Sequence, residues 1–229
     1  MNIAAILAGG RGLRMGSSMP KQFMEIDGKP IIVHTIEKFQ NHIQIDEIYI
    51  VCAPDHCSHM KELVDAYKFT KVKSILPGGA DRQKSSFIAV EEVYKSHSPK
   101  DIILIHDAAR PNINPEIISK NIAAASNIGA CNTVIPSQDT ILISDDSRTI
   151  SEYTDRSRMY LVQTPQSFKL DVIYSAHIKC VDSLGITDDC SMVTETGGTV
   201  ELVPGDKYNL KITTEEDLKL FSFLVKCGK

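Results

Sequence analysis

The fold is decided by residues 3–21, which read IAAILAGGRGLRMGSSMPK. The apolar residues at the start of this stretch predict a buried strand, and the glycines that follow predict a tight turn. Because Gly9 and Gly10 lack a Cβ atom, the backbone there can approach an anion closely and point its amide groups at it. Arg14 and Lys21 add positive charge, so the stretch indicates a loop that binds a triphosphate.

Neither of the two common phosphate-binding motifs fits this turn. A dinucleotide fingerprint that starts at Gly10 needs glycine where the chain has Met15. A P-loop needs a Gly-Lys pair followed by Ser or Thr, whereas Gly28 and Lys29 are followed by Pro30. A surface turn with solvated cations is the alternative, and the clustering of Arg and Lys beside a buried strand makes it the weaker one.

Length and composition indicate one globular domain over residues 1–229. The chain has a formal net charge of -4, with 42% hydrophobic and 24% charged residues, which is ordinary for a folded protein. A nucleic-acid partner normally requires a basic face, so this charge argues against one and favours a small anionic ligand. Since the sequence has no long apolar run and no signal-peptide pattern, we expect a cytoplasmic protein with no membrane partner. The six cysteines lack disulfide-scaffold or zinc-finger spacing, so we expect free thiols.

Short apolar runs alternate with helical patterns along most of the chain, which is typical of an α/β fold. We expect a mostly parallel, Rossmann-like sheet with helices on both faces. The expected strands are residues 3–7, 47–52, 71–76, 102–106, 130–136 and 199–203. The expected helices are residues 30–40, 57–67, 84–95, 115–127 and 169–183, then one that starts near Asp188 and one that Thr214 opens.

Residues at about 139–162 interrupt this alternation. Within them, the sequence ILISDDSRTISEYT predicts two short strands around a polar turn. A lone hairpin of this kind has too little apolar surface to be stable by itself. We therefore expect a protruding β-hairpin arm that packs against a second chain.

Candidate functional residues follow the carboxyl ends of the expected strands, where ligands collect in open α/β sheets. Gly79 and Ser85 mark a second glycine turn that leads into a helix, and an ordinary turn with a capping serine is the alternative. Asp107 ends a strand opposite both turns, which suits a magnesium ion shared with substrate phosphates. An ion pair between Asp107 and Arg110 is the alternative. Lys211 stands in an expected strand among uncharged neighbours, where it would meet an anion or, at a sheet edge, solvent.

These motifs together resemble the IspD/TarI-type cytidylyltransferase family, which makes CDP-activated sugar alcohols. The family includes 2-C-methyl-D-erythritol 4-phosphate cytidylyltransferase and ribitol-5-phosphate cytidylyltransferase. The resemblance covers nearly the whole chain, with its blocks in the expected order. The blocks are LAGGRGLRMG (7–16), PKQF (20–23), GGADR (78–82) with Ser85, HDAARP (106–111), DT (139–140), TDR (154–156), QTPQSF (163–168), ITDD (186–189) and NLKIT (209–213).

The resemblance implies a nucleotidyltransferase sheet that transfers CMP from CTP to a polyol phosphate, with Mg²⁺ as the cation. It implies catalytic roles for Arg14, Lys21 and Lys211, and a metal-binding role for Asp107. The nucleotide-binding residues that it implies are Ala8, Gly9, Gly10, Gly79, Ala80, Ser85 and Ala108. The acceptor-binding residues that it implies are Arg110, Thr140, Arg156, Thr164 and Thr187. In the family, the residue matching Arg156 lies on a swapped arm and reaches the neighbouring subunit, which implies a homodimer.

The motifs do not agree on the acceptor, because some are more similar to one subfamily and some to the other. HDAARP, TDR and ITDD are more similar to the methylerythritol enzyme, whereas LAGG, MPKQF, MYLVQTPQSF and GACNTVI are more similar to the ribitol enzyme. Because the first set is the one that touches the acceptor in the family, we expect 2-C-methyl-D-erythritol 4-phosphate, an isoprenoid precursor. Ribitol 5-phosphate, used for cell-surface polymers, is the alternative.

Two other classes of protein are weaker alternatives. A nucleotide-sugar glycosyltransferase usually has a D-x-D pair, but Asp107 is followed by Ala108 and Ala109. A nucleotide-binding regulator without catalysis would not need several cations converging on one phosphorus atom. Both alternatives are therefore less favoured than nucleotidyl transfer.

Overall fold

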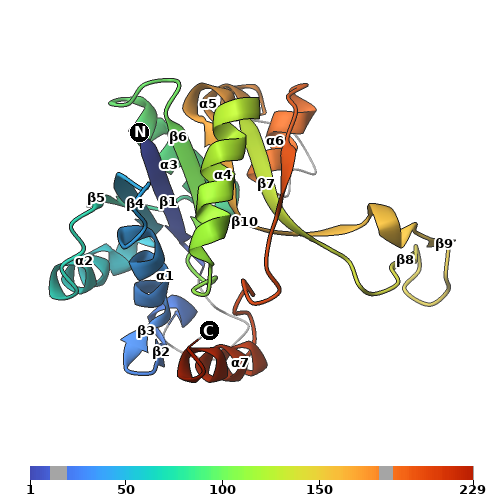
Figure 1. Cartoon of the computed structure of the whole chain (residues 1–229), viewed down its shortest axis with the longest axis horizontal. Helices are drawn as coiled ribbons and strands as arrows, with labels where there is room; N and C mark the ends of the chain where they lie inside the picture. Colours follow the sequence, from blue (N-terminus) through green and yellow to red (C-terminus); the bar gives the residue numbers. More distant parts are fainter. Residues whose placement is uncertain (11–19, 181–187, 229) are drawn as a thin grey trace.

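A seven-stranded sheet forms the centre of the molecule, in the order β11-β7-β10-β6-β1-β4-β5 (Figure 1). The computed structural model describes residues 1–10, 20–180 and 188–228. The strands are β1 (Asn2–Ala8), β4 (Glu47–Cys52), β5 (Val72–Pro77), β6 (Ile102–Asp107), β7 (Ala130–Pro136), β10 (Tyr160–Lys169) and β11 (Glu201–Pro204). All of their pairings are parallel except those of β10, which runs antiparallel to β6 and β7. The expected α/β fold with a mostly parallel sheet is confirmed.

The central strand β1 shows why helices are needed on both faces. Its side chains alternate across the sheet, so Ala4 and Ile6 join one hydrophobic cluster while Ile3 and Ala5 join the other. The first cluster is covered by α1 (Ile31–Gln40), α2 (Cys57–Ala66) and α4 (Pro115–Ile128). The second is covered by α3 (Arg82–Tyr94), α5 (Leu170–Lys179) and α6 (Asp189–Glu195). Because neither face is left to solvent, the sheet edge at the strand ends is the place where a ligand can enter.

The helix boundaries follow the local capping chemistry. The side chain of Asn114 accepts a hydrogen bond from the Glu116 amide at the start of α4, and Gly129, with φ of 105°, ends that helix. The last helix, α7 (Glu215–Lys226), begins with a capping box in which Thr214 and Asp217 bond to each other's backbone amides. Both starts are as predicted. α7 packs apart from the main sheet, against Ile31 and Ile212.

The strand β10 is a feature that the sequence analysis did not expect. Its buried part includes the polar residues Gln163, Thr164, Gln166 and Ser167, so it shows no alternation of apolar and polar residues. A shift of register against β7 between Val162 and Gln166 interrupts its pairing. These side chains are accommodated through hydrogen bonds, such as that from Ser167 to Asn121, rather than through apolar contacts. Apolar periodicity therefore could not reveal this strand.

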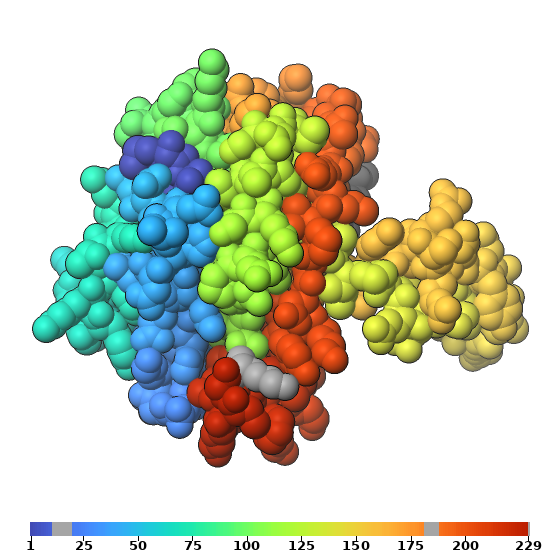
Figure 2. All heavy atoms as spheres, in the orientation of Figure 1, coloured from blue at the N-terminus to red at the C-terminus, as the bar shows by residue number. Residues whose placement is uncertain are grey.

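The predicted hairpin is present and projects from the rest of the molecule, as Figures 1 and 2 show. We call residues 137–159 the arm and the remainder of the chain the body. The arm contains the short strands β8 (Leu142–Ile143) and β9 (Glu152–Tyr153), and the chain rejoins the sheet when Tyr160 pairs with Pro136. The arm thus ends slightly earlier than the predicted residue 162. The body carries a further small sheet of β2 (Glu25–Ile26) and β3 (Lys29–Pro30).

Two further expectations concern membranes and thiols. None of the helices within residues 1–10, 20–180 and 188–228 has the length and apolar character needed to cross a bilayer. All six cysteines are free, although the sulfur atoms of Cys52 and Cys57 are 3.5 Å apart. The expected thiols are confirmed.

Candidate active site

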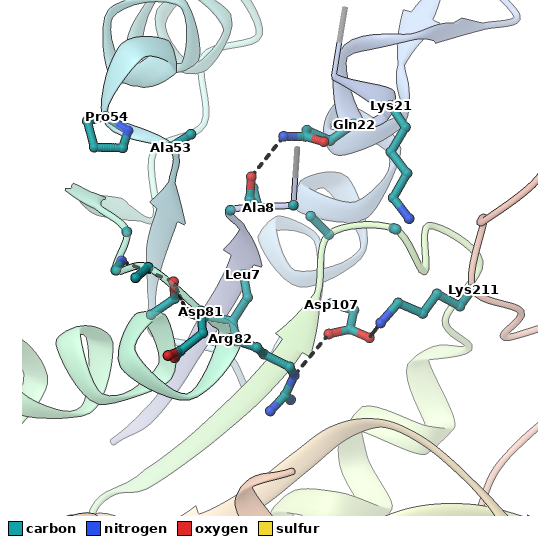
Figure 3. Close-up of a pocket in the computed structure, with 18 of the residues that line it drawn as sticks. Leu7, Ala8, Lys21, Gln22, Ala53, Pro54, Asp81, Arg82, Asp107 and Lys211 are labelled. Carbon is teal, nitrogen blue, oxygen red and sulfur yellow. Dashed lines mark hydrogen bonds and ion pairs between the residues drawn. The ribbon is translucent and has the colours of Figure 1, made fainter. Parts of the chain in front are cut away.

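A cavity of about 500 Å³ opens at the carboxyl ends of β1, β4, β5 and β6 (Figure 3). In open α/β sheets this edge is the usual place for a ligand. All of the predicted nucleotide-binding residues line the cavity, namely Ala8, Gly9, Gly10, Gly79, Ala80, Ser85 and Ala108. The structure thus brings together residues from three separate loops that the sequence analysis assigned to one ligand.

The second glycine turn is built around the hydroxyl group of Ser85. This hydroxyl accepts a hydrogen bond from the Gly79 amide at 3.1 Å and donates one to the Asp81 carbonyl at 2.8 Å. A Cβ atom at Gly79 would collide with the Cβ atom of Lys84, so glycine is required there. The side chain of Asp81 caps α3 by accepting from the Lys84 amide. Ser85 therefore holds the turn in shape as well as lining the cavity.

Lys21 and Lys211 meet at the opposite wall of the cavity, although they are far apart in the sequence. Lys21 belongs to the short 3-10 helix η2 (Lys21–Phe23), and its Nζ atom donates to the Ile212 carbonyl at 2.7 Å. Lys211 itself lies in irregular chain, which corrects the expectation that it stands in a strand. The Ile212 amide makes a single hydrogen bond to the Ala109 carbonyl, at 2.8 Å, and this contact fixes the segment beside the loop after β6 without forming a strand ladder.

Three cations surround the carboxylate of Asp107 at the end of β6. The Nζ atom of Lys211 lies 2.8 Å from Oδ2, and the Nε atoms of Arg82 and Arg110 lie 3.6 Å from Oδ1 and 3.7 Å from Oδ2. Burial alone would raise the pKa of Asp107, but the positive charges of Lys211, Arg82 and Arg110 outweigh burial and hold that pKa well below its usual range. The carboxylate is therefore ionised at neutral pH.

A buried chain of hydrogen bonds supports Asp107 from below. The amide of Asp107 donates to the Thr164 hydroxyl at 3.0 Å, and this hydroxyl lies 3.0 Å from Nδ1 of His106. The other ring nitrogen of His106 lies 3.1 Å from the Arg110 carbonyl. A carbonyl can only accept, so Nε2 carries the proton and Nδ1 accepts from Thr164. Burial lowers the pKa of His106 to about 4, so His106 is a neutral structural residue.

Two predicted acceptor-binding residues, Arg110 and Thr164, lie next to the cavity and are largely buried. Nη1 of Arg110 donates to the Asn209 carbonyl at 2.8 Å, and Nη2 donates to the Val162 carbonyl at 3.4 Å. These contacts tie the loop after β6 to β10 and to the segment that carries Lys211. Arg110 and Thr164 therefore lie behind Asp107 and hold the loop that carries it.

Two further predicted residues, Thr140 and Arg156, are not brought to the cavity by their own chain. Thr140 and Arg156 lie on the arm, where Nη1 of Arg156 donates to the Gln138 carbonyl at 3.0 Å. Figure 1 shows this arm pointing away from the body. Arg14 and Thr187 lie outside the described residues. The predicted acceptor site is thus split between the body and the arm.

Arg82 is a charged cavity residue to which the sequence analysis assigned no role, although it lies within the GGADR block. Arg82 is the first residue of α3, lines the cavity and faces Asp107. A cation in the first turn of a helix interacts unfavourably with the helix dipole. This unfavourable position was the available signal that Arg82 has a partner or a function. Its partner Asp189 lies far away in the sequence, so the pairing itself has no local signature.

Asp107 fits a divalent cation that substrate phosphates also bind. Mg²⁺ is commonly held by one or two carboxylates together with phosphate oxygens, and the Asp107 carboxylate is ionised. Within the part of the chain that the structure describes, no cluster of three His, Cys, Asp or Glu side chains forms a metal site by itself. The predicted metal-binding role of Asp107 therefore requires the nucleotide phosphates as further ligands.

Comparisons with known proteins agree with this geometry. Residues 2–227 match the family model described as IspD: 2-C-methyl-D-erythritol 4-phosphate cytidylyltransferase. A ribitol-5-phosphate cytidylyltransferase of Streptococcus agalactiae serotype III (strain NEM316) is 40% identical over 228 residues, which cover 98% of this chain and 95% of that protein.

Two crystal structures show the same fold. The 4-diphosphocytidyl-2C-methyl-D-erythritol synthase of Anaerococcus prevotii DSM 20548 superposes with a TM-score of 0.84 and 29% identity, over 98% of this chain and 96% of that one. Another 4-diphosphocytidyl-2C-methyl-D-erythritol synthase superposes with a TM-score of 0.82 and 28% identity, over 98% of both chains. The similarity therefore extends along the whole length of the chain.

Proposed function

Because this chain belongs to the IspD family of CTP-dependent cytidylyltransferases, which act on polyol phosphates, we propose that its acceptor is ribitol 5-phosphate. The observation that carries this proposal is the 40% identity to a ribitol-5-phosphate cytidylyltransferase over 98% of the chain. The two methylerythritol synthases are 28% and 29% identical. The motifs had favoured 2-C-methyl-D-erythritol 4-phosphate, and the relatives support the alternative better. The product would be CDP-ribitol, with release of pyrophosphate.

The reaction joins two anions, and the cavity offers the charges that this requires. A phosphate oxygen of the acceptor attacks the α-phosphorus of CTP, the new P–O bond forms, and the bond to pyrophosphate breaks with the electron pair leaving on pyrophosphate. The acceptor phosphate is already ionised near neutral pH, so the attack needs no general base. His106 is neutral, buried and bonded at both ring nitrogens, which agrees with a mechanism that does not use it as a base.

Positive charge is the main contribution of the protein in this proposal. Lys21 and Lys211 face the cavity from one wall, and we assign them, with Arg14, to the phosphates of CTP and the transition state. Fixed cations of this kind stabilise developing charge without reorganising during the reaction. Mg²⁺ held by Asp107 and the nucleotide phosphates would neutralise further phosphate charge. The glycine turns at Gly9 and Gly79 let the backbone approach the nucleotide.

The acceptor is assigned to residues of both the body and the arm. Arg110, Thr164 and Thr187 would bind it from the body, and Thr140 and Arg156 from the arm. The arm residues lie outside the cavity of their own chain, so this assignment requires the arm of a second copy. We therefore propose a homodimer in which each arm completes the acceptor site of the other subunit.

The test is release of pyrophosphate from CTP and Mg²⁺ with purified protein. Ribitol 5-phosphate and 2-C-methyl-D-erythritol 4-phosphate are compared side by side, each over a range of concentrations, and a reaction without acceptor is the control. We expect a higher kcat/KM with ribitol 5-phosphate. A higher kcat/KM with methylerythritol phosphate would contradict the proposed acceptor, and release without any acceptor would contradict the transfer itself.

A further inference from the structure

A second network of charged groups lies behind the cavity wall and meets the cavity at Arg82. The Nη1 atom of Arg82 donates to Oδ2 of Asp189 at 2.7 Å, while its Nε atom lies 3.6 Å from Oδ1 of Asp107. The guanidinium group is thus held between two carboxylates that lie far apart in the sequence. The Arg82 side chain remains 31% exposed, and Figure 3 shows it beside Asp107 at the cavity.

Asp189 is built into the body as a fixed anchor. It is the first residue of α6 and is completely buried. The hydroxyl of Ser86 donates to its Oδ1 atom, Nε2 of His177 lies 3.6 Å from the same atom, and the Asp189 amide donates to Oε1 of Gln166. Both carboxylate oxygens therefore have partners, Arg82 and Ser86 from α3 and His177 from α5, and the backbone is tied to β10.

The charge state of this anchor is clear from its surroundings. Burial would raise the pKa of Asp189, but the charge of Arg82 and the contacts of His177 and Ser86 outweigh burial and lower that pKa. Burying an ion pair is costly, and well-packed apolar residues often stabilise a fold equally well. Stability alone therefore does not explain why an ionised carboxylate lies behind an arginine that faces a ligand cavity.

Orientation of Arg82 is the benefit that the geometry offers. An arginine side chain has many rotamers, and fixing it before a ligand arrives reduces the entropy lost on binding. Asp189 takes up one edge of the guanidinium, which leaves its other groups beside the cavity between the Gly79 turn and Asp107. A planar guanidinium in such a position is well suited to phosphate. It also offsets the repulsion between the Asp107 carboxylate and an incoming triphosphate.

We propose that Asp189 is a positioning residue that fixes Arg82 at the cavity wall, and that Arg82 binds a phosphate group of CTP. This inference rests on the proposed use of the cavity for CTP, and it does not depend on which polyol phosphate is the acceptor. Ser86 and Gln166 support Asp189 without touching Arg82.

The experiment measures the binding of CTP by calorimetry without acceptor, so that no turnover occurs. The proteins are wild type, Arg82→Gln, Asp189→Asn and the double variant, in which a neutral pair of similar shape replaces the ion pair. Lys95→Gln is the matched control, because it removes a positive charge from the C-terminal end of the same helix, α3, where Lys95 pairs with Glu92 away from the cavity. Cytidine, which lacks phosphate, is the second probe.

Each single variant is expected to weaken CTP binding by about tenfold, the usual effect of losing one charge-assisted hydrogen bond. The double variant should bind no more weakly than Arg82→Gln, because Asp189 acts through Arg82. Lys95→Gln should bind CTP like the wild type, and cytidine binding should be unchanged in all variants. Should Asp189→Asn fail to fold, Arg82→Gln and the double variant still give the result.

Wild-type CTP affinity in Arg82→Gln or in the double variant would overturn the proposal. The proposal would also be overturned if the fold-loss of CTP affinity in the double variant equalled the product of the two single losses, because Asp189 would then act independently of Arg82. An equal loss of affinity for cytidine and for CTP would show that Arg82 does not act on a phosphate group. A wild-type enzyme that binds CTP but does not use ribitol 5-phosphate would contradict the proposed acceptor and leave this inference standing.

Discussion

The cavity edge of the body and the arm differ in how far one chain can complete them. At the cavity, Asp107 already has Lys211, Arg82 and Arg110 around it, and each of these comes from a different part of the body. On the arm, Leu142, Ile143, Ile150 and Tyr153 are 44 to 64% exposed. This contrast teaches that one chain assembles the cavity by itself, whereas the proposed role of the arm in binding the acceptor requires a second copy.

The largest expected effect compares loss of an aromatic side chain in the two regions. Phe168 is completely buried in the body and Tyr153 is 64% exposed on the arm. Phe168→Ala should lower the free energy of unfolding by about 3–5 kcal/mol, because it leaves a cavity in the core. Tyr153→Ala should change the free energy of unfolding of the isolated subunit by less than about 0.5 kcal/mol. Urea unfolding at low protein concentration measures both, and similar losses would contradict the contrast between the regions.

The next effect concerns the two lysines that face the cavity. Lys21→Ala and Lys211→Ala should each lower kcat/KM for pyrophosphate release by about a hundredfold or more, because each removes a fixed positive charge from the transition state. Both variants should keep the wild-type circular dichroism spectrum. Lys95→Ala is the control, because Lys95 is exposed on the body and pairs with Glu92 away from the cavity. Near-normal turnover in Lys21→Ala or Lys211→Ala would contradict the role assigned to that lysine.

A smaller effect separates acceptor binding from nucleotide binding. Arg156→Ala should raise the KM for ribitol 5-phosphate by about tenfold, as expected for losing one charged contact to a phosphate, and should leave the Kd for CTP unchanged. Arg148→Ala serves as the matched control on the same arm, since Arg148 lies in the turn of the hairpin. An equal loss of CTP affinity in Arg156→Ala would show that the arm does not act on the acceptor alone.

The smallest effect is a local pH dependence confined to the arm. Hydrogen bonds from the amides of Thr149 and Arg148 and from the Thr149 hydroxyl lower the pKa of Asp146 to about 2. A carboxyl group whose pKa is lowered by folding stabilises the folded form above its ordinary pKa of about 4 and loses this effect as pH falls towards the lowered value. The turn should therefore loosen between about pH 4 and pH 2.

Hydrogen exchange of the Arg148 and Thr149 amides, corrected for intrinsic rates, measures this loosening. Protection should fall over that pH range in the wild type and be low throughout in Asp146→Ala. Amides of β1, such as that of Ile6, should stay protected until the body unfolds. Loss of protection in β1 at the same pH as in the turn would contradict an independent response of the arm.

Much of the body could be predicted from the sequence because its signals are local. The apolar runs of β1, β4 and β6 and the caps of α4 and α7 depend on neighbouring residues, and their positions agree with the structure. β10 could not be predicted in this way, because its buried residues are polar and their partners lie on distant elements. Lys211 was placed in a strand because its neighbours Leu210 and Ile212 are apolar. In the structure the Ile212 amide bonds to the distant Ala109 carbonyl without forming a strand ladder.

The site shows the same division. The glycine turns, Lys21, Asp107 and Lys211 were identified from motifs, and the structure gathers them in one cavity. The role of Arg82 was missed, because its partner Asp189 is set by the packing of α6 against α3 and α5 rather than by local sequence. The motifs also could not identify the acceptor. Two of the residues assigned to it, Thr140 and Arg156, lie on the arm, which does not meet the cavity within one chain.

The most direct test of the central claim is complementation between two impaired variants, assayed at a ribitol 5-phosphate concentration well below the wild-type KM. Lys211→Ala and Arg156→Ala are co-expressed with different tags, and the mixed dimer is purified through both. If one subunit supplies the body and the other the arm, each mixed dimer has one intact site and should show about half of the wild-type activity per dimer. Activity no higher than the mean of the two separate variants would contradict the claim that the arm completes the site of a second copy.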